Sequence, residues 1–329
     1  MSKNSEKVIR AIDLGWGYTK FSVPTDQGVV FESMPSLAPR HSGLDLTGSF
    51  LSKRNTVVVS VQGTKYEVGP DSLDIDSNDA TRNLNESFVF SDQYKAVFLG
   101  ALHYMNTPVI DRLVMGLPLM NMHLADSVKA MASGKHEVNG VEYTVNEVVV
   151  LGQPLGGLNY CLSLKNDEDF GDLAEETSVF VDVGFLTYDF LYSHGNRPVD
   201  TRSGAHTGGV SKVLRAMADS ISTTYEMKFD NLNAVDRALR RNKLKINGET
   251  VAIEPHILAA KGVIEGTVAY MKNIIGSGAE VDCFVLSGGG AFIYRKTLAL
   301  AYPKHKILNV PDSQMANVKG FYMAGCAIA

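Results

Sequence analysis

The feature that most constrains this chain is a strand that ends in Asp-x-Gly and runs directly into another strand, because the pattern occurs twice. The first copy is built around Asp13-Leu14-Gly15 and the second around Asp182-Val183-Gly184, about half the chain apart. Each copy predicts a tight hairpin rather than a strand followed by a helix. We interpret the two copies as an internal duplication of architecture, which agrees with the two domains that a chain of 329 residues favours.

The segments around the two hairpins alternate between strand and helix patterns, which predicts an α/β protein. The first hairpin extends into a three-stranded antiparallel meander over 8–14, 18–23 and 28–32. Two stretches of different composition, at about 33–88 and about 228–252, predict small inserted subdomains, the first of them containing a strand pair. Further strands are predicted at 111–118, 146–154, 283–287 and 305–310, and helices at 91–106 and 254–275 and from residues 155, 209 and 314.

Charge and composition exclude several classes of function. The net charge of −5 and the lack of any run of five or more Lys and Arg residues argue against direct binding to nucleic acid. The polar start MSKNSEKVIR lacks the apolar stretch of a signal peptide, and the sequence contains no window of about 18 apolar residues. We therefore expect a cytoplasmic protein that does not bind membranes.

The first hairpin carries residues suited to a polyphosphate. Gly15 and Gly17 present backbone N–H groups without side chains in the way. Asp13 at the strand end is expected to act through a bridging Mg²⁺, and Lys20 can return along the second strand as a point charge. A single copy is better explained as a plain hairpin whose Asp caps the turn, whereas two copies would clamp the phosphates from both sides.

A third motif follows the strand at 283–287, where Ser287 and three consecutive glycines lead into a helix at Ala291-Phe292. Backbone without side chains can lie flat against a nucleotide, and a helix N-terminus favours an anion. The alternative is a plain strand-to-helix turn, although three glycines are entropically costly without a close neighbour.

In their order and spacing, these motifs resemble the two phosphate loops and the adenosine loop of the actin, Hsp70 and sugar-kinase superfamily. The segments LVMGLPLMNMH (113–123) and NVKGFYMAGCA (317–327) resemble its bacterial plasmid-segregation branch, the ParM or StbA type. VVVLGQPLGGLNY falls where that branch has its connecting helix. The resemblance implies a two-lobed actin-like, ribonuclease H-like fold, in which each lobe is a five-stranded mixed sheet with helices and ATP or GTP with Mg²⁺ binds in the cleft.

The resemblance also implies domain bounds and site residues. Domain I would comprise 1–175 and 316–329, and domain II would comprise 176–315. Asp13 and Asp182 would hold Mg²⁺ through water, and Gln153 would orient the attacking water, which an amide can do without changing protonation. The expected nucleotide contacts are Gly15, Trp16, Gly17, Tyr18, Lys20, Gly184, Phe185, Thr187, Ser287, Gly288, Gly289, Gly290 and Phe292.

Some of these positions also fit other interpretations. Gln153 could instead be a strand-end residue that bonds only to backbone, and Asp189, which closes the second hairpin, fits a structural role equally well. The bulky Trp16, Phe185 and Leu186 depart from the family pattern and leave open slower hydrolysis or an altered nucleotide preference. The cluster Arg240-Arg241-Asn242-Lys243 is interpreted as a solvated helix face rather than as a contact to adenine.

The function that the resemblance implies first is an ATPase that polymerises into filaments and moves plasmid DNA through a DNA-binding adaptor protein. A non-polymerising nucleotide switch of the Hsp70 kind is the second hypothesis. A small-molecule kinase is the third, and it would need a carboxylate base for the acceptor hydroxyl. Gln153 argues against the kinase, because an amide positions water but does not remove a proton.

Overall fold

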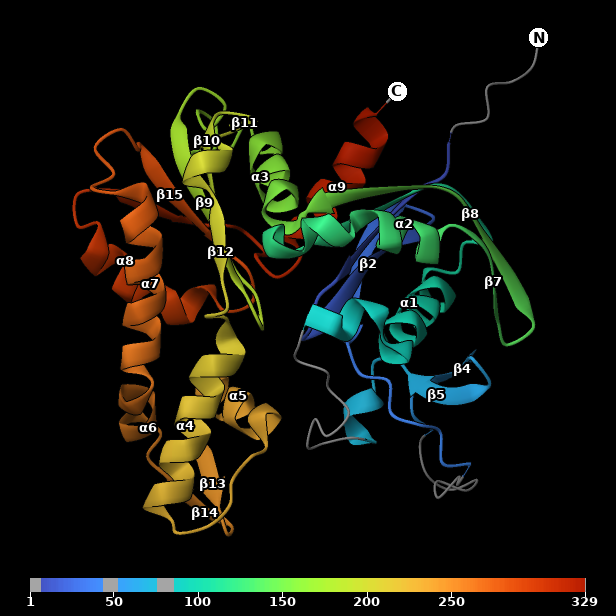
Figure 1. The fold of residues 1–329 in the computed structure, drawn as a ribbon, viewed down its shortest axis with the longest axis horizontal. Coiled ribbons are helices and arrows are strands. Elements are labelled where there is room, and N and C mark those ends of the chain that lie inside the picture. Colours follow the sequence, from blue (N-terminus) through green and yellow to red (C-terminus); the bar gives the residue numbers. More distant parts are fainter. Residues whose placement is uncertain (1–6, 44–52, 76–85, 329) are drawn as a thin grey trace. The chain divides into compact units, whose positions relative to one another are not determined.

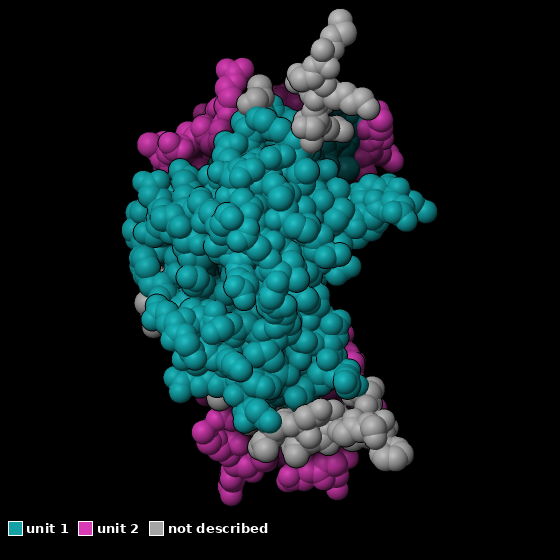
Figure 2. Space-filling view, turned by 90° about the vertical axis from the view of Figure 1, so that its right-hand side faces the viewer, with its two compact units in different colours: residues 1–76, 81–165, 314–329 teal, residues 77–80, 166–313 magenta. Residues whose placement is uncertain are grey.

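The computed structural model of this protein describes residues 7–43, 53–75 and 86–328. The described residues within 1–76, 81–165 and 314–329 form one compact unit, called unit 1, and those within 166–313 form unit 2. The two units are coloured separately in Figure 2. Each is built on one mixed β-sheet.

The sheet of unit 1 contains six strands of the described residues, in the order β3-β2-β1-β6-β8-β7. The pairs β1–β6 and β6–β8 are parallel, and the outer pairs are antiparallel. β1 is buried along its whole length, as expected for a central strand with both faces covered. The strands are β1 (Ile9–Leu14), β2 (Tyr18–Thr25), β3 (Gly28–Pro35), β6 (Val109–Leu117), β7 (Gly134–Val138) and β8 (Val141–Gly152).

The helices of unit 1 cover this sheet. α9 packs on β1 and β6, where Ala11 and Val114 meet Val318 and Phe321. α3 lies beside α9 in Figure 1, and the two come so close that a Cβ on Gly320 would collide with backbone of α3. The helices are α1 (Asp92–Met105), α2 (Ala125–Ala132), α3 (Gln153–Ser163) and α9 (Ala316–Ala327), with short 3-10 turns at Ser72–Asp74, Glu86–Phe90 and Leu119–Leu124. A separate hairpin, β4 (Val57–Val61) and β5 (Thr64–Val68), packs against α1.

The sheet of unit 2 has the order β11-β10-β9-β15-β16, and β12 also pairs with β10, which makes six strands among the described residues. β9–β15 and β15–β16 are parallel, and β9–β10 is antiparallel. The strands are β9 (Thr177–Val183), β10 (Tyr188–His194), β11 (Arg197–Pro198), β12 (Gly204–His206), β15 (Cys283–Ser287) and β16 (Lys306–Asn309).

The core of unit 2 forms where side chains of its sheet, such as Phe190 and Phe284, pack with Leu214 and Met271 of the helices. The helices are α4 (Val210–Thr224), α5 (Leu232–Arg241), α6 (Glu254–Ala259), α7 (Lys261–Ile275) and α8 (Ala291–Ala301), with a 3-10 turn at Asp200–Arg202. A hairpin, β13 (Leu244–Ile246) and β14 (Glu249–Val251), follows α5.

Most of the predicted elements are confirmed, with some differences. The mixed α/β fold with a sheet in each half is confirmed, with six described strands in each sheet where five were expected. The predicted helix at 254–275 is two helices that meet at Ala260, a buried residue whose ψ of −5° interrupts the regular helix. The predicted helix from residue 155 begins earlier, at Gln153, with Pro154 at a position that favours helix initiation.

The segment predicted as an insertion at about 33–88 contains the hairpin β4–β5, as expected from its strand pattern. Its residues 44–52 and 76–85 lie outside the described residues. In the described part of the chain, the helices are too short or too polar to cross a membrane.

Candidate functional site

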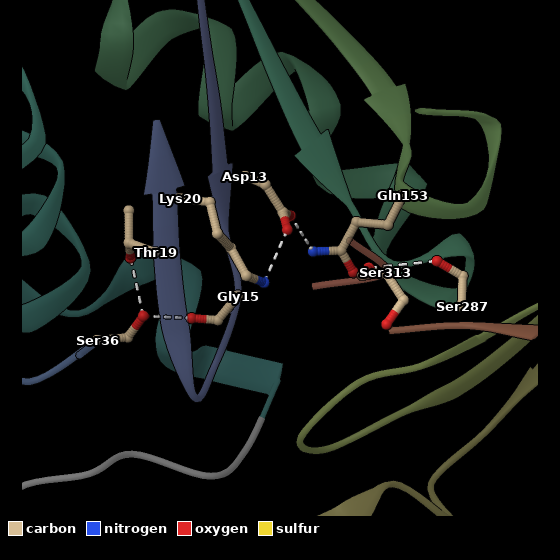
Figure 3. Close-up of polar contacts among 8 residues, drawn as sticks. All are labelled: Asp13, Gly15, Thr19, Lys20, Ser36, Gln153, Ser287 and Ser313. Carbon is tan, nitrogen blue, oxygen red and sulfur yellow. Dashed lines mark hydrogen bonds and ion pairs between the residues drawn. The ribbon is translucent and has the colours of Figure 1, made fainter. Parts of the chain in front are cut away.

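Three predicted site residues of unit 1 meet at the carboxylate of Asp13 (Figure 3). Lys20 lies opposite Asp13 in the β1–β2 register, and its Nζ is 2.9 Å from Asp13 Oδ2. Gln153, the first residue of α3, donates from Nε2 to Asp13 Oδ1 at 2.7 Å. Asp13 is 1% exposed, so its charge is held inside the protein by one ammonium and one amide.

The contact with Asp13 sets the orientation of the Gln153 amide. An ionised carboxylate only accepts hydrogen bonds, so the NH₂ group must face Asp13. Oε1 is therefore the atom of Gln153 that can accept a hydrogen bond from a water or ligand. The interpretation of Gln153 as a strand-end residue that bonds only to backbone is wrong, because it lies in α3 and bonds to a side chain.

At Trp16, in the turn between β1 and β2, the side chain packs into the protein interior. The Trp16 side chain is buried, with its ring centroid 6.5 Å from that of Phe88, and Phe88 in turn packs edge-on against Tyr94. Burial raises the pKa of Tyr94 well above its usual value, and the Asp13 carboxylate raises it further. A ligand at this turn would therefore meet the N–H groups of the backbone and not the indole.

The second hairpin, in unit 2, repeats this geometry with a different charge pattern. Asp182 lies opposite Asp189 in the β9–β10 register, where the first hairpin has Asp13 opposite Lys20. Both aspartates are buried, at 5% and 1% exposure. Like charges directly opposite each other in a strand pair are destabilising unless other groups compensate them, and both aspartates make further contacts in the protein.

The turn of the second hairpin is held by the first residues of α4. The carbonyl oxygens of Gly184, Phe185 and Leu186 accept from the N–H groups of Val210, Ser211 and Gly209, at 2.7–3.0 Å. In a trans peptide the C=O of one residue and the N–H of the next point in opposite directions. The N–H groups of Phe185, Leu186 and Thr187 therefore point away from α4. The Phe185 side chain is partly buried against the core, so only its backbone suits a phosphate.

The glycines that follow β15 have different roles. Gly288 has φ of +86°, and a Cβ on it would collide with the Asp182 carboxylate and the Val183 backbone. A Cβ on Gly290 would collide with Val183 and Val210, whereas one on Gly289 would have no described atom within 4 Å. The packing of unit 2 thus explains two of the glycines and leaves Gly289 facing open space.

Ser313 fixes this glycine loop. Its carbonyl accepts from Gly288 N–H and from Ser287 Oγ, each at 3.3 Å, and its Oγ donates to the Gly288 carbonyl at the same distance. The bond to Ser287 is drawn in Figure 3. Sequence reasoning missed Ser313, because it lies 25 residues from Gly288 and no spacing pattern marks it.

Arg240 of α5 reaches the open glycine. Its Nη2 donates to the Gly289 carbonyl at 3.2 Å, its Nε pairs with Asp236, and its guanidinium lies 5.2 Å from the centre of the Phe292 ring. Phe292 is 49% exposed. Arg241 and Lys243 are exposed, as expected for a solvated helix face. Arg240 differs, because it also contacts the glycine loop after β15. A guanidinium, an exposed ring and a bare backbone together suit a planar aromatic ligand.

The described residues also limit how a metal could bind. They contain no group of three or more His, Cys, Asp or Glu side chains placed to hold a metal ion. Mg²⁺ keeps several waters and takes one or two carboxylates together with substrate phosphates, so it does not need such a group. The lack of such a group among the described residues therefore does not exclude Mg²⁺.

The comparisons with known proteins agree with this architecture. The family model described as "Actin like proteins N terminal domain" matches residues 11–156. A search of the curated proteins finds no match.

Solved structures cover nearly the whole chain at low sequence identity. A non-polymerisable quadruple mutant of pCBH ParM has a TM-score of 0.74 at 18% identity, over 98% of this chain and 100% of that chain. A 15-stranded ParM filament from Clostridium botulinum has a TM-score of 0.77 at 18% identity, with the same coverage. The archaeal actin homologue Ta0583 in complex with ADP has a TM-score of 0.70 at 18% identity, over 96% and 98%. The protein therefore has the actin-like fold along almost its whole length, and its structural relatives are bacterial and archaeal actin homologues.

Proposed function

We propose that the protein binds a Mg-nucleoside triphosphate, ATP or GTP, hydrolyses it, and self-associates into filaments that depend on the nucleotide. The observation that carries the proposal is the cluster at Asp13, where one buried carboxylate is bonded to both Lys20 and Gln153. A partly buried ammonium, paired with a buried carboxylate beside a glycine turn, suits phosphate binding, and an amide fixed on the same carboxylate suits the positioning of water.

In this proposal each residue of unit 1 has a separate task. Lys20 would bind phosphate oxygens, and Asp13 would help to hold Mg²⁺ through water. Mg²⁺ bound with the nucleotide supplies positive charge to the phosphates. Gln153 keeps its NH₂ group on Asp13 and accepts from the attacking water through Oε1, which holds that water in place without removing its proton.

We assign further roles to residues of unit 2. Asp182 takes the role at the second hairpin that Asp13 has at the first, and the N–H groups of the 185–187 turn serve the phosphates. The loop from Ser287 to Gly290 faces the nucleoside, with the base against Phe292 and Arg240. The open position at Gly289 supports this assignment, since a Cβ there would have no described atom within 4 Å.

Self-association is supported by a filament-forming relative. One of the similar structures is a 15-stranded ParM filament, and the match extends over 100% of that chain. An open filament needs two different surfaces on each subunit that bind each other without closing a ring. The role in plasmid segregation and the DNA-binding adaptor stay predictions of the sequence resemblance.

The test is a set of measurements on the full chain. Calorimetry with Mg-ATP, Mg-GTP and Mg-ADP should detect binding, phosphate release should follow with the triphosphates, and light scattering and sedimentation should detect polymer. Absence of any nucleotide uptake would contradict the proposal. Hydrolysis without polymer would favour the nucleotide switch, and transfer of phosphate to a small acceptor would favour the kinase.

A further inference from the structure

Ser36, the residue after β3, forms hydrogen bonds to the turn of the first hairpin (Figure 3). Its backbone N–H donates to the carbonyl of Gly17 at 3.0 Å. Its hydroxyl donates to the carbonyl of Gly15 at 2.5 Å. Ser36 is 3% exposed, so water does not compete for these bonds. One residue thus binds two carbonyl groups of the same tight turn.

Thr19 completes a directed chain of hydroxyl groups. Its Oγ1 lies 2.8 Å from Ser36 Oγ, and Thr19 is fully buried. A serine hydroxyl has one hydrogen, and that of Ser36 is given to Gly15. Thr19 must therefore be the donor to Ser36, and the chain runs from Thr19 to Ser36 to the Gly15 carbonyl. Bonds in such a chain polarise and strengthen one another.

The bonds of Ser36 decide which way the N–H groups of the turn point. The peptide bonds of this turn are trans, so each C=O is opposed to the N–H of the next residue. With the carbonyls of Gly15 and Gly17 directed at Ser36, the N–H groups of Trp16 and Tyr18 are directed to the opposite side. In an ordinary β-turn the carbonyl of the first residue instead accepts from the N–H of the fourth, here Tyr18.

The second hairpin reaches the same result by other means. There the carbonyls of Gly184, Phe185 and Leu186 are bound by backbone N–H groups at the start of α4. Both units therefore bind the carbonyls of the turn on one side, which directs the following N–H groups to the other. In unit 1 the carbonyl of Gly15 is bound by the side-chain hydroxyl of Ser36 and not by a backbone N–H group. A single substitution of Ser36 can therefore remove this hydrogen bond.

We infer that Ser36, supported by Thr19, is a positioning residue that aims the N–H groups of Trp16 and Tyr18 at the phosphates of the nucleotide. The inference rests on the proposed function. Ser36 therefore affects the binding of the phosphates and does not affect the binding of the nucleoside. Neither Ser36 nor Thr19 touches the ligand, and both act through the orientation of the turn.

The test compares ligands that share adenosine and differ in phosphates. For Ser36→Ala, the affinity for Mg-ATP and Mg-ADP should fall about tenfold, while the affinity for adenosine stays at the wild-type value. Thr19→Val keeps the side-chain shape and removes only the donor to Ser36, so it should show the same pattern with a smaller loss. Trp16, the only tryptophan in the sequence, should change its fluorescence spectrum in Ser36→Ala.

Ser22→Ala is the matched control. Ser22 is a buried serine of the same strand pair, and its Oγ accepts from the N–H of Ala11 at 2.9 Å, away from the turn. Its substitution should leave the ratio of Mg-ATP to adenosine affinity unchanged.

Two results would overturn the role of Ser36. Ser36→Ala could bind Mg-ATP as tightly as the wild type, or it could lose Mg-ATP and adenosine equally with a lowered melting temperature, which indicates a general structural effect. If the wild-type protein bound no nucleotide at all, the proposed function would fail first and take this inference with it. The wild-type titration thus separates the two failures.

Discussion

Lys20 lies directly opposite Asp13 in the β1–β2 pair, and its ammonium is 2.9 Å from the Asp13 carboxylate. At the equivalent place in the second hairpin, Asp182 lies opposite Asp189. The duplicated hairpins therefore share a backbone plan but differ in charge, with a neutralised pair in unit 1 and two carboxylates in unit 2.

The first prediction concerns the stability that the Asp13–Lys20 pair provides. Lys20→Met leaves a buried carboxylate without its cation and should lower the free energy of unfolding by about 3 kcal/mol, measured by urea titration. Adding Asp13→Asn should recover most of that loss. The exposed pair Lys135–Glu142 has the same 2.9 Å separation, and Lys135→Met should cost less than about 1 kcal/mol. Equal losses for the two lysines would refute the argument.

The second prediction concerns Gln153. Gln153→Ala should lower kcat for hydrolysis about 100-fold, because the attacking water loses its acceptor, while the affinity for Mg-nucleotide stays within about twofold. Stopped-flow phosphate release and calorimetry measure the two quantities separately. Asn159, also on α3, donates to the Gly320 carbonyl, so Asn159→Ala serves as the control with near-normal kcat. Hydrolysis by Gln153→Ala at the wild-type rate would show that the assigned role is wrong.

The third prediction separates two neighbouring glycines. Gly288→Ala should destabilise the protein by more than about 1 kcal/mol, because φ is +86° and the new Cβ meets Asp182 and Val183. Gly289→Ala should leave the melting temperature unchanged and weaken nucleotide binding, because its Cβ enters space that the described residues leave open. Thermal melts and calorimetry on both variants test this. Unchanged binding by Gly289→Ala would remove the loop from the site.

The hairpins and most helices followed from the sequence because their signals are local. Asp-x-Gly between apolar strands fixes a tight turn, and the opposition of Asp13 and Lys20 follows from the length of that turn. The contacts of Ser36 and Ser313 could not be predicted, since each depends on tertiary contacts that leave no periodicity. Ser36 contacts a turn about 20 residues earlier in the sequence. The break at Ala260 was missed because apolar spacing continues across it.

The fourth prediction concerns pH. Burial lowers the pKa of His256, which shares a 2.9 Å hydrogen bond with Ser220, and burial likewise lowers the pKa of His103, His136 and His206. The unfolded chain therefore takes up protons first as the pH falls below about 6.5. Stability should be fully present above that pH and decline toward pH 5.

Urea titrations between pH 8 and pH 5 measure this decline. His256→Gln should flatten part of it, and substitution of the exposed His123 should not change it. A profile that is flat from pH 8 to pH 5 in the wild type would contradict the lowered pKa of the buried His256 and of the partly buried His103, His136 and His206.

The last prediction distinguishes the base side of the proposed site from the phosphate side. Arg240 bonds to the Gly289 carbonyl and lies over Phe292, whereas the next residue, Arg241, is exposed. Arg240→Ala should weaken the binding of adenosine, Mg-ADP and Mg-ATP by a similar factor, about tenfold, because the lost contact is to the part that all three share. Arg241→Ala removes the same charge one position away and should leave all three affinities unchanged. This pattern is the opposite of the one expected for Ser36→Ala, so the two variants together assign each end of the nucleotide to its own group of residues. A loss for Arg240→Ala that grew with the number of phosphates would instead mean that its guanidinium acts as a general positive charge.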